Sequence, residues 1–344
     1  MHLAVQLLFN LRHHRAAHRR VLLLTDPRTG VDQTEVVRLL EPWSMPLSAA
    51  AQIAAPVPSG ALVGLATTCD VIAVLSTDAA LVASVRDEAA SHQLPVVTCS
   101  TPEGDTREAG LFEELAFHDR QLAGRDAQTG AHAEYASVVV THLSAASCSA
   151  LFPHYVLPFL GRTIGQQHGN PIAAVDLGCG PMSALRWGAL HGLMSVTGID
   201  PLLDMYSVLL NRHGYAALPA VRCAREIASG AETISDYIGP DSLDFVFSRN
   251  ALDHAVDPPR IIFEAARCLR SGGVMAIEVF TREGSREKWW ALHQHDMYLD
   301  AQHRFLCESQ DGSIRPMVAS DSGLHLQQVV ASTPRTTAVV FQKN

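Results

Sequence analysis

Short apolar runs alternate with segments of helical spacing over the first part of the chain. Alternation of this kind is typical of a parallel, wound α/β sheet. The apolar runs, which we interpret as buried strands, lie at 20–26, 71–76 and 94–100. The segments with helical spacing lie at 32–43 and 78–92, the second with Asp78 as its N-cap. We therefore expect a small α/β domain over residues 1–102, and it contains no GxxxxGK[ST] phosphate loop.

Residues 103–168 read as mostly helical, with a polar first part that breaks at Gly130 and a more apolar second part. We interpret them as a helical linker and cap between two α/β domains.

From residue 169 to 344 the alternation of strands and helices resumes more clearly. Strands are predicted at 172–176, 195–200, 217–223, 243–248 and 274–280, the one at 217–223 being the weakest. Helices are predicted at 185–192, 202–214 and 257–273, the last with Asp257 as N-cap, Pro258 at its first position and Gly272 after its end. The last two alternating strands, 324–332 and 336–344, are separated by a Pro-containing turn and predict a hairpin.

The first twenty residues are apolar and then basic, and they contain no acidic residue. A transit peptide or a membrane-surface helix has this composition. An ordinary leading helix that packs on the next strand also fits, and we favour it because no small-residue cleavage site follows the apolar part.

Composition narrows the function classes. The chain has 344 residues, 47% of them hydrophobic and 18% charged, which is enough for a large core. The net charge of −9 leaves no basic face at domain scale and argues against nucleic acid as a partner. No apolar run is long enough to span a membrane. The seven cysteines are scattered without CxxC spacing, which favours reduced thiols and a cytoplasmic location.

Candidate chemistry begins where the strand at 172–176 ends. Asp176 is followed by Gly178 and Gly180, and the next strand ends in Asp200. Glycines let the backbone approach a ligand, and a carboxylate at the second strand can accept both hydroxyls of a ribose. The dinucleotide pattern GxGxxG fails at Ser183, and Asp176 suits a cationic ligand better than a pyrophosphate. The pattern indicates half of a nucleoside site for a sulfonium compound.

The sequences VDLGCGP and GID, followed by LDFVFSRNALDHAVDPPRIIFEAARCLRSGGVMAIE, resemble the class I S-adenosylmethionine-dependent methyltransferases of small-molecule type. The resemblance covers about residues 131–344, and the N-terminal part resembles no family. It implies a Rossmann-like sheet of seven strands with a reversed C-terminal hairpin, S-adenosylmethionine as cofactor and a small-molecule acceptor. The helical residues 131–165 would cover the cofactor cleft.

The resemblance also implies roles for matching positions. The turn after the first strand would face the methionine part of the cofactor, Asp200 would hold the ribose, residues after the third strand would border adenine, and residues at the fourth strand would close the site. The cofactor-binding residues expected on this basis are Asp176, Gly178, Cys179, Gly180, Asp200, Pro201, Ala224, Arg225, Glu226, Ser248, Arg249 and Asn250. Two positions depart from the family pattern: Met182 stands at the third glycine, and Ala224 stands where an adenine-binding Asp is common.

Three histidines are candidates for acid–base chemistry on the acceptor. His254 lies just past the fourth strand and could deprotonate a hydroxyl, or it could pack under the next helix. His293 and His295 lie close to Asp296 after the fifth strand, where they could contact substrate, ligate a metal or belong to a lid. With 17 histidines in the chain, chance clustering is expected, so we predict no metal site.

These observations favour a methyltransferase that acts on an O, N or C atom of a small molecule, in a biosynthetic pathway. One alternative is a protein that binds the cofactor without methyl transfer, as a non-methylating catalyst or a structural site. A nicotinamide oxidoreductase is a further alternative, which the missing third glycine disfavours. For the N-terminal domain we expect a structural role or a homodimer contact.

Overall fold

The computed structural model describes residues 3–15, 20–26, 29, 47–52, 71–76, 78–90, 93–98, 107–123, 151, 155–156, 158–159, 170–218 and 222–344. The chain divides into two compact units, residues 1–104 and 105–344. The expected helix at 32–43 and most of residues 124–169, and with them most of the expected cap at 131–165, lie outside the described residues.

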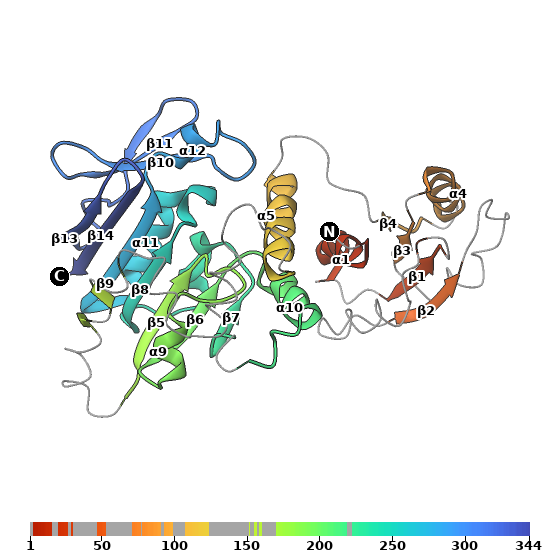
Figure 1. Ribbon diagram of the computed structural model, residues 1–344, viewed down its shortest axis with the longest axis horizontal. Coiled ribbons are helices and arrows are strands. Elements are labelled where there is room, and N and C mark those ends of the chain that lie inside the picture. The colour runs from red at the N-terminus through yellow and green to blue at the C-terminus, as the bar shows by residue number, and fades with distance from the viewer. Residues whose placement is uncertain are drawn as a thin grey trace. The chain divides into compact units, whose positions relative to one another are not determined.

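The first unit contains a parallel sheet with the strand order β2-β1-β3-β4 (Figure 1). The strands are β1 Val21–Thr25, β2 Leu47–Gln52, β3 Val71–Leu75 and β4 Val96–Thr98. Three of them were predicted. The fourth, β2, was missed because its sequence, LSAAAQ, consists mainly of small residues without a β-branched side chain.

Two helices pack on this sheet. The basic leading segment forms α1, Leu3–Arg15, which packs against β3 and β4, with Asn10 donating a hydrogen bond to the Thr98 carbonyl oxygen at 2.6 Å. Helix α4, Ala79–Ala90, begins where predicted, because Asp78 accepts hydrogen bonds from the backbone N–H groups of Ala80 and Leu81. The leading segment is therefore a helix of the fold, as the favoured interpretation expected.

The second unit is built on a seven-stranded sheet with the order β13-β14-β9-β8-β5-β6-β7 (Figure 1). All neighbours are parallel except at β14, which runs antiparallel to both β9 and β13. The strands are β5 Ile172–Leu177, β6 Met194–Ile199, β7 Arg225–Ile227, β8 Leu243–Arg249, β9 Leu269–Phe280, β13 Leu324–Ser332 and β14 Thr336–Lys343. This order confirms the predicted Rossmann-like sheet with its reversed C-terminal hairpin.

The helices of the second unit are mostly those expected. They are α5 Arg107–Leu122, α9 Arg186–Leu190, α10 Leu203–Arg212, α11 Pro258–Cys268 and α12 Glu283–Arg286, with 3-10 helices η4 Ala231–Asp236 and η5 Leu252–His254. Helix α11 starts as predicted, because Asp257 accepts a hydrogen bond from the Arg260 N–H. It ends earlier than predicted, since β9 already begins at Leu269 and Gly272, with φ +77°, lies inside that strand.

A second, smaller sheet follows β9 in the chain. Its antiparallel strands are β10 His295–Leu299, β11 Phe305–Ser309 and β12 Ile314–Pro316. Met297, Phe305, Cys307 and Met317 of this region are buried in the same core as β9 and α11. From His295 onward this segment is therefore packed sheet.

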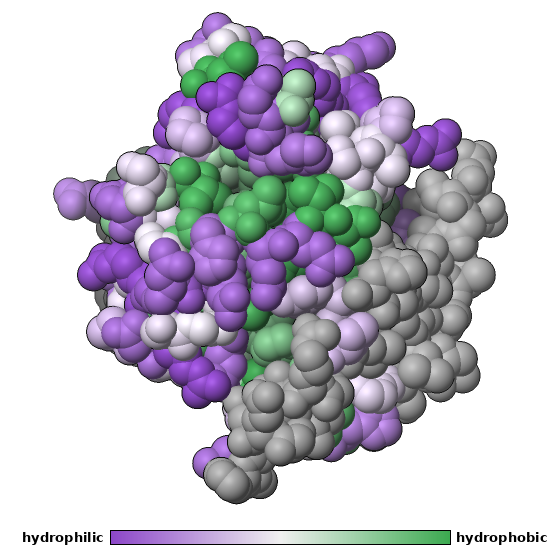
Figure 2. All heavy atoms as spheres, turned by 90° about the vertical axis from the view of Figure 1, so that its left-hand side faces the viewer, coloured by the Kyte–Doolittle hydropathy of each residue, from purple (hydrophilic) through white to green (hydrophobic). Residues whose placement is uncertain are grey.

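Figure 2 looks onto the side of the molecule that carries the C-terminal hairpin in Figure 1, and apolar side chains gather there between polar ones. The edge strand β13 is one source of exposed apolar surface, since Leu326 is 36% exposed. Within the part of the chain that the structure describes, no helix has the length and apolarity needed to cross a bilayer.

Candidate functional site

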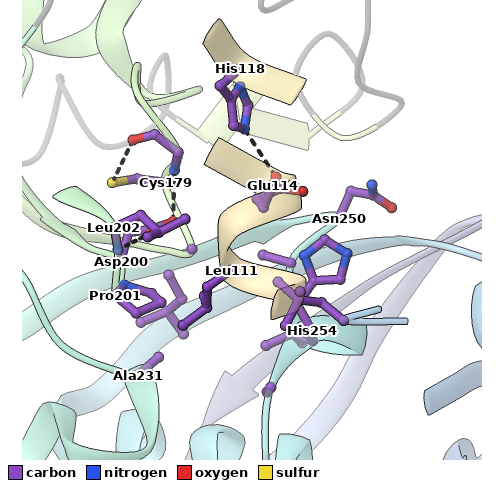
Figure 3. A pocket seen from close by; sticks show the side chains of 18 of the residues that line it. Leu111, Glu114, His118, Cys179, Asp200, Pro201, Leu202, Ala231, Asn250 and His254 are labelled. Atoms are coloured by element: carbon purple, nitrogen blue, oxygen red, sulfur yellow. Dashed lines mark hydrogen bonds and ion pairs between the residues drawn. The ribbon is translucent and has the colours of Figure 1, made fainter. Parts of the chain in front are cut away.

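A cavity of about 660 Å³ opens at the carboxyl ends of the central parallel strands of the second unit. In Figure 3, Cys179, Asp200 and Pro201 lie on one side, Asn250 and His254 lie on the other, and helix α5 passes between them. Ligands bind at this edge of wound sheets. Ten of the residues predicted from the sequence line the cavity: Asp176, Gly178, Cys179, Gly180, Asp200, Pro201, Arg249, Asn250, His254 and His293.

The turn after β5 brings backbone, without side chains, to the wall of the cavity. Gly178 and Gly180 both have positive φ, +67° and +61°, which glycine adopts without strain. A Cβ on Gly178 would stand 2.2 Å from the Cβ of Ala251, in the loop after β8. The turn therefore requires glycine at position 178 for two reasons, its backbone angle and the close approach of a second strand end.

Asp200 connects the turns that follow β5 and β6. One carboxylate oxygen accepts a hydrogen bond from the Gly180 N–H at 3.1 Å, and the other accepts one from the Leu202 N–H at 2.8 Å. The side chain is buried at the cavity wall, and burial raises its pKa to about 6, although both hydrogen bonds act in the opposite direction. A buried carboxylate in a cavity wall is suited to accept hydrogen bonds from a bound polyol.

Asp176 has a local role in the same turn. It accepts hydrogen bonds from the Ser183 hydroxyl at 2.6 Å and from the Ala184 N–H at 3.0 Å. Burial raises its pKa to about 6 against those hydrogen bonds. Its carboxylate thus fixes the path of the chain from β5 to α9, in addition to placing an acid near the glycine turn.

The expected adenine-bordering residues need correction. The third strand is β7 at 225–227 and not 217–223, so Arg225 and Glu226 lie inside the strand and none of Ala224, Arg225 and Glu226 lines the cavity. Glu226 instead pairs with Arg222. The residues that follow β7 and do line the cavity are Gly230, Ala231 and Glu232, and the sequence SGAE marked a turn there.

Two of the three residues predicted at the fourth strand face the cavity. Arg249 lines it and pairs with Glu278, and Asn250, with φ +49°, accepts a hydrogen bond from the Phe280 N–H. Ser248 does not reach the cavity, because it is fully buried and donates its hydroxyl to the Leu177 carbonyl oxygen between β8 and β5. Its role is therefore to join two strands.

Helix α5 contributes residues that the sequence analysis did not single out. Leu111, Glu114 and His118 line the cavity, and His118 Nε2 lies 3.0 Å from Glu114 Oε1 (Figure 3). Burial would raise the pKa of Glu114, but the hydrogen bond from His118 and the charges of the neighbouring histidines outweigh it and lower the pKa to about 2. The i,i+4 spacing of Glu114 and His118 is the feature of the sequence from which this pair could have been predicted.

Two of the three predicted histidines meet at the other end of the cavity. His293 Nδ1 lies 2.7 Å from Asp253 Oδ2 and 3.2 Å from His254 Nε2, and His254 Nε2 lies 3.4 Å from the same Asp253 oxygen. Burial would lower the pKa of His293, but the hydrogen bond and charge of Asp253 raise it. Asp253 is 2% exposed, and no pattern in the sequence marks it as the centre of the cluster.

His295 and Asp296 are not part of this cluster. His295 is buried in β10, where Nε2 contacts the Ala255 carbonyl oxygen at 3.1 Å and burial lowers its pKa. Asp296 accepts a hydrogen bond from the Ser285 N–H. Neither residue lines the cavity, so the predicted catalytic role of His295 is wrong in this structure: His295 begins β10 and packs against the Ala255 carbonyl, whereas His293 lies in the turn before that strand.

Chemically, the cavity has two different ends. Backbone turns and the carboxylates of Asp176 and Asp200 form one end, which fits a cationic nucleoside compound. Imidazoles and carboxylates form the other end, which can hold or move a proton. The cavity wall also includes Trp290, which is 62% exposed and donates its indole N–H to Glu113 of α5.

Residues 175–277 match the family model described as "Methyltransferase domain". No curated protein matches the chain. Among solved structures, an S-adenosylmethionine-dependent methyltransferase from Mesorhizobium loti is 17% identical, with 57% of this chain and 98% of that chain covered and a TM-score of 0.35. The 1,6-didemethyltoxoflavin-N1-methyltransferase from Burkholderia thailandensis, solved with 1,6-didemethyltoxoflavin and S-adenosylhomocysteine, is 16% identical, with 71% and 93% covered and a TM-score of 0.36.

The family match and the strand order agree with the identification made from the motifs. Residues 175–277 match a methyltransferase domain, and the strand order is the one that the resemblance to the class I S-adenosylmethionine-dependent methyltransferases implied. The N-terminal unit lies outside this match.

Proposed function

We propose that the chain catalyses the transfer of the methyl group of S-adenosylmethionine to an O, N or C atom of a small molecule, in a biosynthetic pathway. The observation that carries the proposal is that one cavity joins the glycine turn and carboxylates of the methyltransferase motifs to the cluster of Asp253, His254 and His293. The cofactor supplies a methyl group already activated by a sulfonium, so the protein mainly positions two reactants.

At the cofactor end, each group of cavity residues would hold one part of the cofactor. Asp200 would accept the two ribose hydroxyls, and the turn from Gly178 to Gly180 would approach the methionine part. Gly230 and Ala231, which replace the residues first expected, would border the adenine, since they follow the strand next to the ribose-binding one.

At the acceptor end, the cluster of Asp253, His254 and His293 would supply a base that takes a proton from an O or N acceptor. Asp253 holds the imidazole of His293 in place, and the histidines provide nitrogen atoms for a proton of the acceptor. Helix α5, with Leu111 and Glu114, lies between the two ends and would help to exclude water from the reacting atoms.

Calorimetric titration with S-adenosylmethionine and S-adenosylhomocysteine tests the first half of this proposal. Mass spectrometry of a panel of hydroxyl, amine and carbon acceptors tests the second half. Binding without any methylated product across the panel would favour a protein that uses the cofactor without methyl transfer. Absence of heat with both compounds would contradict the proposal.

We also propose a cytoplasmic location and a structural or dimerising role for the N-terminal unit. In the described part of the chain Cys179, Cys223, Cys268 and Cys307 are free thiols, which fits a reducing compartment. Sedimentation of the full chain and of a variant altered on the N-terminal unit would test the dimer.

The affinity for the cofactor should fall as the pH drops through about 6. Burial places the pKa values of Asp176 and Asp200 at about 6, and the proposed contacts require ionised carboxylates. Below that pH, each protonated carboxylate should weaken binding by up to about tenfold per pH unit. Calorimetry with S-adenosylhomocysteine between about pH 5 and pH 6.5 measures the effect.

The stability of the free protein should move in the opposite direction. A pKa raised above the unfolded value means that the folded state binds more protons between about pH 4 and 6, so these two groups increase the free energy of unfolding as the pH falls through that window.

In the variant Asp200→Asn, the pH dependence of cofactor binding should become shallower. An affinity that stays constant over this range would contradict the assignment of ionised carboxylates to the cofactor.

A further inference from the structure

Three donor atoms at the acceptor end of the cavity lie close enough to share one ion. They are Asp253 Oδ2, His254 Nε2 and His293 Nδ1, all within 4.8 Å of one another. The three edges of this triangle measure 2.7, 3.2 and 3.4 Å. We propose that Asp253, His254 and His293 bind a divalent transition-metal ion of the zinc class, with open positions facing the cavity.

The spacing of the donor atoms suits such an ion. Nitrogen and oxygen ligands of tetrahedral zinc lie about 2.0–2.1 Å from the metal, which places them about 3.3–3.4 Å from one another. Two edges of the observed triangle already have nearly this length, and the third, at 2.7 Å, needs to widen by about 0.6–0.7 Å. Two imidazoles and one carboxylate are also the donor set that zinc, cobalt and iron(II) prefer over magnesium or calcium.

A buried polar atom without a partner gives independent support. Asp253 Oδ1 and Glu283 Oε2 are buried, and neither has a hydrogen-bond partner within the described part of the chain. Asp253 is 2% exposed and Glu283 is 6% exposed, and Glu283 lines the same cavity. Buried polar atoms normally have partners. An ion that Asp253 holds through both oxygens would give Oδ1 a partner beside Oδ2, and a molecule bound to that ion next to Glu283 would satisfy the second carboxylate.

The charges around the cluster favour a cation. Glu283 lies near Asp253, and burial together with the charge of Asp253 raises the pKa of Glu283 to about 8. Glu114 and Glu287 also line the cavity. On the basic side, the guanidinium of Arg107 donates to the His254 carbonyl oxygen at 2.8 Å. Arg107 therefore binds the backbone of the cluster and leaves its three donor atoms available.

Three protein ligands leave room for a fourth, as in catalytic zinc sites. That position would take an acceptor with a hydroxyl, thiol or carboxylate group, and the ion would lower the pKa of a hydroxyl or thiol bound to it. This role for the acceptor rests on the proposed function, whereas metal binding itself does not.

The test uses the full chain after treatment with a chelator. Titration with Co²⁺ should produce the visible absorption of a tetrahedral site, saturating at one ion per chain, and Zn²⁺ should displace it. The substitutions His293→Ala and His254→Ala should each weaken the affinity by about 100-fold or more, since even outer partners of a metal site contribute about 10–100-fold. The control is His303→Asn, which alters an exposed histidine in the turn after β10 whose φ of +58° asparagine tolerates.

The melting temperature of the metal-free protein serves as the measure of folding in each variant. A variant that keeps the parent melting temperature and loses Co²⁺ supports the proposal. The metal site is overturned if the parent chain gives no saturable cobalt spectrum, or if His293→Ala and His254→Ala bind Co²⁺ as the control does. Saturable metal binding without methyl transfer would leave the metal site standing and count against the proposed function instead, so the two failures are distinguishable.

Discussion

Replacement of Asp200 by alanine should weaken binding of S-adenosylmethionine by about 100-fold or more. We propose that the carboxylate accepts hydrogen bonds from both ribose hydroxyls. A hydrogen bond to a charged group contributes about 1.5–3 kcal/mol, and about 1.4 kcal/mol corresponds to a factor of ten in affinity. Two such bonds therefore account for the expected effect. Calorimetric titration of the parent and variant proteins with the cofactor measures it.

The same substitution also removes the acceptor for two backbone N–H groups, those of Gly180 and Leu202. The melting temperature of the free variant must therefore be measured beside its affinity. Asp200→Asn keeps one carbonyl oxygen as an acceptor and should lose less stability while still losing affinity. A matched control is Asp204→Asn on α10, where the carboxylate accepts a local hydrogen bond from the Met205 N–H. Affinities for Asp200→Ala within threefold of the control would contradict the ribose assignment.

The cofactor end of the site could be predicted from the sequence because its information is local. Asp176, Gly178 and Gly180 lie in one turn, and the turn follows an apolar strand directly. Asp200 ends the next strand along the chain, and sequential parallel strands are usually neighbours in the sheet, as β5 and β6 are. The periodicity of the strands and the positions of the glycines were therefore sufficient to predict these residues.

The acceptor end could not be predicted to the same extent because its contacts are long-range. His293 meets Asp253, which is 40 positions away in the chain, and only the fold of the segment after β9 brings them together. His295 had the same local appearance as His293, but His295 lies in β10 and is buried against the Ala255 carbonyl, whereas His293 lies in the turn before that strand. The spacing of the histidines does not show where the strand begins, and therefore not which of them it buries.

The third strand shows a different limit. β7 has only three residues, Arg225–Ile227, and two of them are charged. We predicted the strand at 217–223 instead, because that segment is more apolar. A short strand beside β6 is defined by its backbone pairing, from Thr197 with Arg225 to Ile199 with Ile227, and not by its own hydrophobicity. A shift of a few residues in this strand was enough to misplace every residue expected near the adenine.

Gly178→Ala should have the largest effect on stability and should reduce cofactor binding as well. Alanine at φ +67° is strained by about 1–2 kcal/mol, and its Cβ would stand 2.2 Å from the Cβ of Ala251, so one of the two loops must move. Overpacking of this kind adds about 1–3 kcal/mol. At about 2–4 °C per kcal/mol for a domain of this size, we expect the melting temperature to fall by roughly 5–15 °C. Thermal unfolding with and without S-adenosylhomocysteine measures both effects.

The chain offers a control that separates strain from collision. Gly192 has the same φ of +67°, but a Cβ there would meet no atom within 4 Å, so Gly192→Ala should show the strain alone. The double substitution Gly178→Ala with Ala251→Gly removes the colliding methyl group and should return the stability close to that of Gly192→Ala, which is a direct measure of coupling between the two positions. Because Ala251 is followed by η5, which carries Asp253 and His254, the collision should also disturb the acceptor end, and the double variant should restore it. Equal melting temperatures for Gly178→Ala and Gly192→Ala would show that the two strand ends are not in contact, and the cavity as a single site joining cofactor and acceptor would then lose its structural basis.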